Sequence, residues 1–365
     1  MTCPAVLLLT PGDRLEARRF IEGQGLTFEE TYDDLVGIFE AESLVATGAR
    51  SGFVLKMLAI DPDHQGAELL GELTTELMRL GRAAGHDVFW IFTRPANAPS
   101  FEQLNFRLLV TDGPVALLEF GSGFERYLAS HGALRRPGRN AAIVANANPF
   151  TLGHLFLAEA AARAADTLYL FVVREDRSVF PFDVRFRLAT ESTRHLANVV
   201  LLDTSRYAVS AGTFPSYFLK QDDEVARAQM RIDAALFARC LAPPFGITRR
   251  FVGHEPYCAA TASYNQAMSD VLPPHGIELV EIRRAENAAG FISATRVRDA
   301  LAAGDIASIA QMVPAPTLAF LKSPEGSAIA KQLARDMGPD GADSDASGAA
   351  PVRPSKAPGR TVERN

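Results

Sequence analysis

The stretch Ala141–His154, AAIVANANPFTLGH, joins a run of small and β-branched residues to the start of an amphipathic segment. The run at 141–147 is typical of a buried strand, and the segment at 154–165 is typical of a helix. A strand that passes directly into a helix brings free backbone N–H groups and the positive end of the helix dipole to one place. The stretch therefore predicts a phosphate-binding loop at the carboxyl end of a strand.

The same alternation of strands and helices continues downstream. Helices are predicted at 182–197 and 222–240, and further buried strands at 167–173, 198–203, 248–253 and 277–282. Strands that alternate with helices favour a parallel sheet with right-handed crossovers. We therefore expect an α/β domain over 141–325, built as a doubly wound, Rossmann-like parallel sheet of five strands.

The first 130 residues follow a different pattern. One clear helix is predicted at 69–85, and strands are predicted at 53–60, 87–93 and 116–120. We expect an α+β domain over 1–130, followed by a linker at 131–140 that is rich in Gly and Arg. The segment 338–365 has little apolar surface to bury, so we expect a disordered tail there.

The composition of the 365 residues argues against several classes of protein. Lys plus Arg is 37 and Asp plus Glu is 43, a net charge of −6 that argues against a broad nucleic-acid surface. No apolar run approaches the roughly 18 residues of a membrane span, and the N-terminus lacks the basic segment of a secretory signal. The three cysteines are far apart and give neither a disulfide framework nor paired metal ligands. We expect a cytoplasmic protein without a protein-bound metal.

The loop at 146–154 supplies the first candidate site residues. Gly153 permits a nucleotide to approach the backbone closely, and His154 can donate to a phosphate oxygen during displacement at phosphorus. A turn glycine beside a surface histidine would explain an isolated Gly-His pair, but the strand–helix context favours the phosphate site. The other ATP-binding candidates in this loop are Asn148, Phe150 and Thr151.

The stretch 292–298, ISATRVR, supplies the second set of candidates at the start of another predicted helix. Ser293 and Thr295 bring two hydroxyls to this N-terminus, and Arg296 and Arg298 bring two guanidinium groups. Arg298 is the stronger phosphate candidate, because a guanidinium can bind two oxygens at once. Capping of the helix by Ser293 or Thr295 is a second interpretation, compatible with the first.

These two loops resemble the paired motifs of the nucleotidyltransferase superfamily with the HIGH motif. Longer stretches are similar to the citrate (pro-3S)-lyase ligase family, namely LFVVREDRSVFPFDVR (170–185), GTFPSYFLK (212–220), RFVGHEPYCAATASYNQ (250–266) and ISATRVR. In that family a GNAT-like acetyltransferase domain precedes the nucleotidyltransferase domain, as expected here. The resemblance implies ATP and Mg²⁺ as cofactors, acetate as substrate and the citrate lyase acyl carrier subunit as partner. ATP would adenylate acetate, pyrophosphate would leave, and acetyl would pass to the prosthetic-group thiol of the carrier.

Further residues are consistent with that implied reaction, in which anions must be brought together by cations. His154, Ser293 and Arg298 are the expected catalytic residues. Arg174 follows the second strand of the sheet, and Arg185 lies one turn into the next helix, where a solvated helix face is its alternative. Two candidates are less specific: Lys220 for acetate or the carrier, unless its stem only covers apolar surface, and Glu255 for the adenine amino group, unless it is structural.

The first domain departs from the acetyltransferase pattern at one residue. The loop Asp63–Leu69 matches the pyrophosphate-binding segment (Q/R)xxGx(G/A), but Glu68 stands where the second small residue is expected. Its bulk and negative charge predict a degraded acetyl-CoA site and a docking or structural role for the domain. Two other functions stay open: an adenylyltransferase for a small phosphorylated metabolite, and a carrier-binding protein in which the acetyltransferase fold acts.

Overall fold

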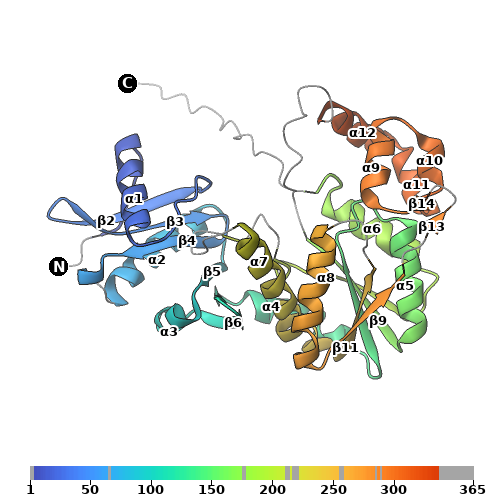
Figure 1. The fold of residues 1–365 in the computed structure, drawn as a ribbon, viewed down its shortest axis with the longest axis horizontal. Helices are drawn as coiled ribbons and strands as arrows, with labels where there is room; N and C mark the ends of the chain where they lie inside the picture. The colour runs from blue at the N-terminus through green and yellow to red at the C-terminus, as the bar shows by residue number, and fades with distance from the viewer. Residues whose placement is uncertain are drawn as a thin grey trace, which may run out of the picture.

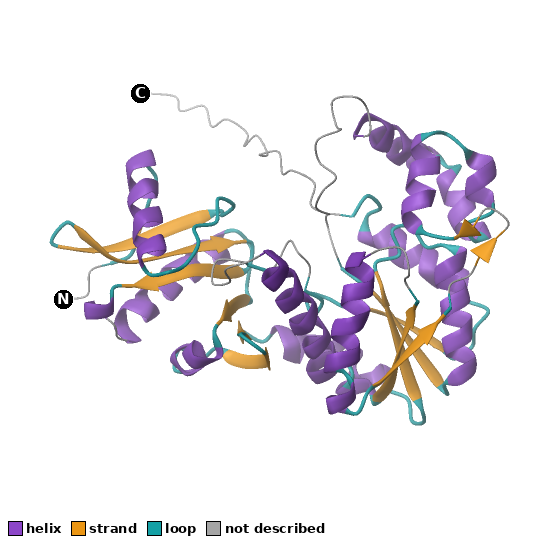
Figure 2. Cartoon of the chain, in the orientation of Figure 1, coloured by secondary structure: helices purple, strands orange, loops and turns teal. Residues whose placement is uncertain are grey.

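The computed structural model describes residues 4–64, 67–174, 178–209, 214–215, 222–254, 259–283, 286–287 and 290–336. Two sheets lie side by side along the long axis of the molecule, each with its own helices (Figure 1). The first sheet contains the strands up to residue 120, and the second contains the strands between residues 140 and 282 (Figure 2). Two short strands after residue 285 pair with each other in a separate small sheet. The predicted combination of an α+β part and an α/β part is confirmed.

The first sheet has seven strands in the order β1-β2-β3-β4-β5-β7-β6. Only β4 and β5 are parallel neighbours, and every other pair is antiparallel. The strands are β1 (Val6–Leu7), β2 (Asp34–Glu40), β3 (Ser43–Ser51), β4 (Val54–Ile60), β5 (Phe89–Thr93), β6 (Arg107–Asp112) and β7 (Val115–Phe120). The helices of this part are α1 (Pro11–Gly23), α2 (Ala67–Ala83), α3 (Ala98–Glu102) and α4 (Gly123–His131).

The second sheet has five strands, all parallel, in the order β10-β9-β8-β11-β12. The strands are β8 (Asn140–Ala145), β9 (Thr167–Val172), β10 (Val199–Asp203), β11 (Ile247–Gly253) and β12 (Glu278–Ile282). Each of the five predicted strands is present, with its ends shifted by two residues at most.

Helices cover both faces of this second sheet, so the doubly wound prediction is correct. On one face α5 (Leu152–Ala164) and α6 (Phe182–Thr193) pack through Ala158, Ala161 and Leu188. On the other face α7 (Asp222–Leu236) and α8 (Ala259–Val271) pack through Ile232 and Met268, and they lie between the two sheets (Figure 1). The C-terminal part adds β13 (Glu286–Asn287), β14 (Gly290–Phe291), α9 (Ala294–Ala302), α10 (Ile306–Ala310), α11 (Ala315–Leu321) and α12 (Pro324–Asp336).

Buried polar contacts join the two sheets across a shared hydrophobic core. Glu119 of β7 is 1% exposed and accepts hydrogen bonds from Trp90 Nε1 at 3.0 Å and from the Tyr207 hydroxyl at 2.8 Å. Arg231 of α7 forms an ion pair with Asp112 of β6, with Nε 2.5 Å from Oδ1. The first part is therefore fixed against the second through side chains from both.

The predicted linker at 131–140 also packs against the second sheet. It contains a 3-10 turn at Gly132–Leu134, and the Arg136 N–H donates to the Tyr169 hydroxyl at 2.8 Å. The domain boundaries stay a prediction, and the tail at 338–365 lies outside the described residues.

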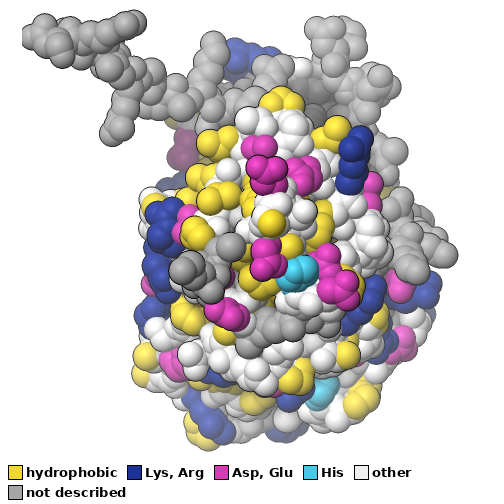
Figure 3. Space-filling view, turned by 90° about the vertical axis from the view of Figure 1, so that its left-hand side faces the viewer, with side chains coloured by type: hydrophobic (Ala, Val, Ile, Leu, Met, Phe, Trp, Pro, Cys, Tyr) yellow, Lys and Arg dark blue, Asp and Glu magenta, His cyan; other side chains and the backbone are white. Residues whose placement is uncertain are grey.

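The end of the molecule formed by the first sheet has a mixed surface. Acidic side chains gather over the middle of this face, basic ones lie mainly near its edges, and hydrophobic ones are interspersed (Figure 3). Glu68, in the first turn of α2, is exposed. Among the described residues there is no helix long and apolar enough to cross a membrane.

Candidate functional site

The central strands β8 and β11 pair with each other only over their first residues. Their register ends where Arg250 lies opposite Ala142, although β8 continues to Ala145 and β11 to Gly253. The strands therefore separate towards their carboxyl ends, at the point of the sheet where the strand order reverses. Ligands bind at this switch point in open parallel sheets. A cavity of about 570 Å³ opens here.

Both predicted loops line this cavity. Gly153 and His154 come from the first loop, and Ser293, Thr295 and Arg296 come from the second. The prediction that His154 and Ser293 lie at one edge of the sheet near one pocket is confirmed. The cavity therefore has helix N-termini from α5 and α9 in its wall, and both favour anions.

A capping box at the start of α5 orients His154. Thr151 is the N-cap residue, and its Oγ1 accepts a hydrogen bond from the His154 N–H at 3.3 Å. In return the Thr151 N–H donates to His154 Nδ1 at 3.0 Å. Because Nδ1 accepts this bond, we assign the ring proton to Nε2. His154 is thus held in the tautomer that can donate from Nε2.

Gly153 lies where the two loops meet. A Cβ atom at this position would be 3.4 Å from the carbonyl oxygen of Ile292 and 3.4 Å from Thr151 Oγ1. A small residue here lets the first turn of α5 pack directly against the second loop. Close approach of a nucleotide to this backbone, the predicted reason for the glycine, stays a prediction.

The second loop is organised by its own cap. Ser293 is the N-cap residue of α9 and accepts from the Arg296 N–H at 3.2 Å. Arg296 donates to the carbonyl of Phe291, and its guanidinium lies 5.5 Å from the centroid of that ring. The capping interpretation of Ser293 is therefore correct, and it leaves Arg296 in the wall of the cavity.

Arg298 joins the two loops to each other. Its Nη1 donates to the carbonyl of Asn148 at 2.7 Å, and its Nη2 donates to Thr295 Oγ1 at 3.1 Å. The cavity wall contains Arg296 and does not include Arg298. In this conformation the guanidinium predicted to bind phosphate fixes the distance between the loops.

Arg185 lies behind the first loop. It is 0% exposed, so the alternative of a solvated helix face is wrong. Its Nε donates to the Phe180 carbonyl at 2.9 Å, and its Nη1 lies 2.7 Å from the Asn146 carbonyl and 2.8 Å from the Val173 carbonyl. Arg185 therefore ties together the ends of β8 and β9 and the segment that enters α6.

Asn148 and Phe150 also support the loop from within. Asn148 Oδ1 accepts from the Phe180 N–H at 2.9 Å. Phe150 is 0% exposed, and its carbonyl accepts from the Thr317 hydroxyl at 2.9 Å. Both residues lie outside the wall of the cavity.

Arg174 is not part of the cavity wall among the described residues. Arg174 lies beyond β9, with its guanidinium 4.1 Å from the centroid of the Phe182 ring and its Nε 3.6 Å from Asp203 Oδ1. Lys220 and Glu255 lie outside the described residues, so their predicted roles are untested.

Comparison with known proteins decides the family. Residues 140–321 match the family model described as the citrate lyase ligase C-terminal domain. A [citrate [pro-3S]-lyase] ligase of Klebsiella pneumoniae is 41% identical over 87% of this chain and 95% of its own length. The corresponding ligase of Escherichia coli K12 is 37% identical over 84% of this chain and 90% of its own length. This chain belongs to the citrate lyase ligase family.

Solved structures show more distant likeness to this family member. Thermotoga maritima TmcAL bound with alpha-thio ATP is 16% identical, covers 50% of this chain and 55% of its own, and has a TM-score of 0.33. An N-acetyltransferase from Staphylococcus aureus Mu50 is 15% identical, covers 33% of this chain and 98% of its own, and has a TM-score of 0.27.

A third group of residues in this citrate lyase ligase was not predicted from the sequence. Arg250 of β11 and Tyr264 and Asn265 of α8 also line the cavity, and Asn265 Nδ2 donates to the Gly253 carbonyl at 3.1 Å. Burial raises the pKa of Asp233, which accepts from the Tyr264 hydroxyl, and burial also raises the pKa of Tyr264 itself. The sequence feature that could have indicated this group is Arg250 itself, a charged residue in the middle of a strand predicted to be buried.

The donors around the cavity suit phosphate oxygens better than a bare metal ion. Guanidinium, imidazole and backbone N–H groups donate hydrogen bonds, whereas Mg²⁺ needs oxygen ligands. Among the described residues no group of three or more His, Cys, Asp or Glu is placed to hold a metal. A divalent ion at this site would therefore be held largely by phosphate oxygens and water.

Proposed function

We propose that this protein is an ATP-dependent ligase that adenylates acetate and acetylates the prosthetic-group thiol of the citrate lyase acyl carrier subunit, releasing AMP and pyrophosphate. The observation that carries the proposal is the shared cavity, in which the capped His154 faces the second loop at the switch point of the sheet. The family membership supports the same reaction, since relatives that span most of the chain are ligases of citrate lyase. We also propose that the protein is cytoplasmic.

In the first step, an acetate oxygen attacks the α-phosphorus of ATP. A new O–P bond forms, the bond to the bridging oxygen of the β-phosphate breaks, and pyrophosphate leaves with that electron pair. Negative charge grows on the leaving oxygens, where His154 Nε2, Arg296 and the N–H groups of α5 would donate. Because these donors are fixed by caps, little reorganisation is needed in the transition state.

We propose that Mg²⁺ arrives bound to the polyphosphate of ATP and neutralises part of its charge. The protein residues then hold the two loops, and their hydrogen-bond donors, in place. Arg298 holds the two loops together through Asn148 and Thr295, and Arg185 fixes the base of the first loop. Loss of Arg298 or Arg185 would displace the hydrogen-bond donors around the cavity. It would not remove a group that acts on the phosphate itself.

In the second step, the thiolate of the carrier's prosthetic group attacks the acetyl carbonyl, a thioester forms, and AMP leaves. The acyl carrier subunit is thus the second substrate.

Substitution of His154 tests the proposal. We expect His154→Ala to lower acetate-dependent exchange of pyrophosphate into ATP by about 10² to 10³, the effect of losing one transition-state donor. Its melting temperature should change little. His195→Ala is the matched control, because His195 is exposed and its ring lies 3.3 Å from the Glu159 carboxylate at the surface. Equal activity of the two variants would contradict the role of His154, and exchange driven by a phosphorylated metabolite instead of acetate would favour the metabolite adenylyltransferase.

A further inference from the structure

Arg250 is a buried cation with unused hydrogen-bonding capacity. Its residue is 2% exposed, and neither Nε nor Nη1 has a hydrogen-bond partner among the described residues. Only Nη2 is bonded, to the Tyr264 hydroxyl at 3.1 Å. The guanidinium carbon lies 4.4 Å from the centroid of the Phe237 ring, but this contact satisfies neither of the two unbonded nitrogens. Buried N–H donors without acceptors are costly, because their desolvation is not repaid. Such a group indicates a ligand that completes it.

Arg250 lies at the junction of two cavities. The first is the cavity of about 570 Å³ that contains the two loops, and the second has a volume of about 310 Å³. Val144, Arg250 and Tyr264 line both. Because Arg250 is the last residue of β11 that pairs with β8, its side chain lies at the floor of the split between these strands.

The second cavity has the chemistry of a site for a small carboxylate. Val173, Val209 and Met230 give it apolar walls, which suit a short alkyl group, and Arg250 gives it one cation. Asp233 also lines this cavity, and it accepts hydrogen bonds from the Tyr264 hydroxyl and from the Val209 N–H, the latter at 2.7 Å. A single cation beside an acidic group, whose pKa is raised by burial, matches one negative charge better than the two charges of a phosphate.

We infer that Arg250 binds the carboxylate of acetate in this second cavity and presents one of its oxygens to the α-phosphate of ATP in the first. The inference rests on the proposed function. It assigns the acid substrate to the α7–α8 side of the β8–β11 split, and the phosphates to the side of the loops. Tyr264 and Asp233 act through Arg250 as positioning residues, because they hold Nη2 and leave Nε and Nη1 for the substrate.

Kinetics of pyrophosphate exchange by the full chain separate this role from a structural one. We expect Arg250→Met to raise the KM for acetate by about 10- to 100-fold, the effect of losing hydrogen bonds to a charged group, and to leave the KM for ATP within about threefold. Arg249→Met is the matched control: it is the preceding residue, and its Nε pairs with Glu278 at 2.7 Å near the surface. The control should leave both constants unchanged.

Two results would overturn the inference. One is an unchanged KM for acetate in Arg250→Met, and the other is an equal rise of both KM values, which would make Arg250 a structural residue. Should Arg250→Met fail to fold, Arg250→Lys keeps a cation without the planar fork, and the same selective rise in the KM for acetate is expected. Failure of the proposed function is distinguishable, because the unmodified protein would then show no acetate-dependent exchange at all.

Discussion

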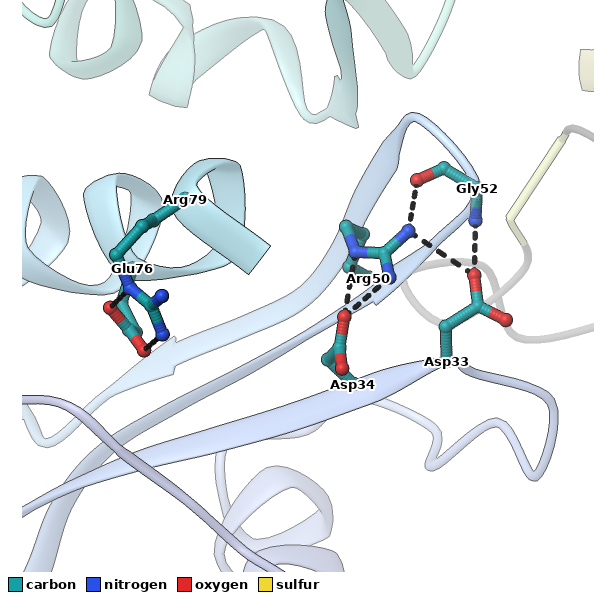
Figure 4. Close-up of polar contacts among 6 residues, drawn as sticks. All are labelled: Asp33, Asp34, Arg50, Gly52, Glu76 and Arg79. Atoms are coloured by element: carbon teal, nitrogen blue, oxygen red, sulfur yellow. Dashed lines mark hydrogen bonds and ion pairs between the residues drawn. The ribbon is translucent and has the colours of Figure 1, made fainter. Parts of the chain in front are cut away.

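Two buried arginines, one in each sheet, are held in opposite ways. Arg50 of β3 is 4% exposed, and its Nε donates to Asp34 Oδ2 at 2.8 Å while its Nη1 donates to the Gly52 carbonyl at 2.6 Å (Figure 4). Arg50 Nη1 also donates to Asp33 Oδ2 at 3.3 Å. Arg250 of β11 is equally buried, yet two of its three nitrogens have no partner among the described residues. A buried cation whose hydrogen-bond partners all come from the protein stabilises the fold. A buried cation that lacks such partners is suited to bind a ligand.

The largest expected effect on stability concerns the satisfied arginine. Arg50→Met should lower the free energy of unfolding by about 3–5 kcal/mol, because it leaves the Asp34 carboxylate partly buried without its cation. The KM for acetate of the folded fraction should not change. Denaturant unfolding measures the first quantity and pyrophosphate exchange the second.

The exposed ion pair on α2 is the control for Arg50→Met. Arg79 donates to Glu76 in two bonds of 2.7 Å, but its side chain is 62% exposed (Figure 4). Arg79→Met should therefore have little effect on unfolding. If folded Arg50→Met protein showed a raised KM for acetate, the distinction between a structural Arg50 and a substrate-binding Arg250 would be wrong.

A medium effect is expected at the contact between the sheets. Burial and the neighbouring Glu119 raise the pKa of Tyr207, so its hydroxyl stays protonated and donates to the buried carboxylate. Tyr207→Phe removes this donor and should lower the free energy of unfolding by about 1–3 kcal/mol without affecting the KM for acetate. Thermal unfolding followed together with exchange activity tests this. Unaltered stability would show that the other donors to Glu119, namely Trp90 Nε1, the Phe124 N–H and Arg107 Nη2, satisfy it without the tyrosine.

The smallest effect is expected at the cap of α10. The Ser308 side chain and N–H stabilise the ionised Asp305 and lower its pKa. A carboxyl with a lowered pKa in the folded state contributes stability above its unfolded pKa of about 4, and this contribution is lost as the pH falls through the folded pKa. Asp305→Ala should thus lower the melting temperature slightly at pH 7, and the difference from the unmodified protein should shrink as the pH falls below about 4 and through the folded pKa. A difference that persists in acid would mean that the side chain acts by packing.

The parts of the fold that could be predicted are those with local signals. The five strands of the second sheet were predictable from β-branched runs between amphipathic helices. The hairpin of β2 and β3 was missed. Its turn residues, Ala41 and Glu42, have φ values of 47° and 71°, a conformation that usually carries Asn or Gly.

The site was predictable where it depends on short motifs, and not where it depends on distant segments. His154 was predictable from a strand that passes directly into a helix, and Ser293 from hydroxyls and guanidinium groups at the start of another predicted helix. Arg185 binds carbonyls at the ends of two strands, and the exposure of a helical arginine cannot be inferred from its own helix. Arg250 is part of the site only because β8 and β11 separate beyond it, which is a property of the whole sheet.

The central claim is that the cavity of the second sheet joins acetate to the α-phosphorus of ATP. A single turnover with acetate labelled by ¹⁸O in its carboxylate, holo acyl carrier and ATP tests it most directly, since mass spectrometry of the AMP shows where the acetate oxygen goes. We predict that AMP gains a labelled oxygen, because that oxygen forms the new bond to phosphorus and stays there when the thiolate displaces AMP. Unlabelled AMP would contradict this account. Acetylation of the carrier from acetyl-CoA without ATP would also contradict it and would assign the transfer to the part of the molecule built on the first sheet.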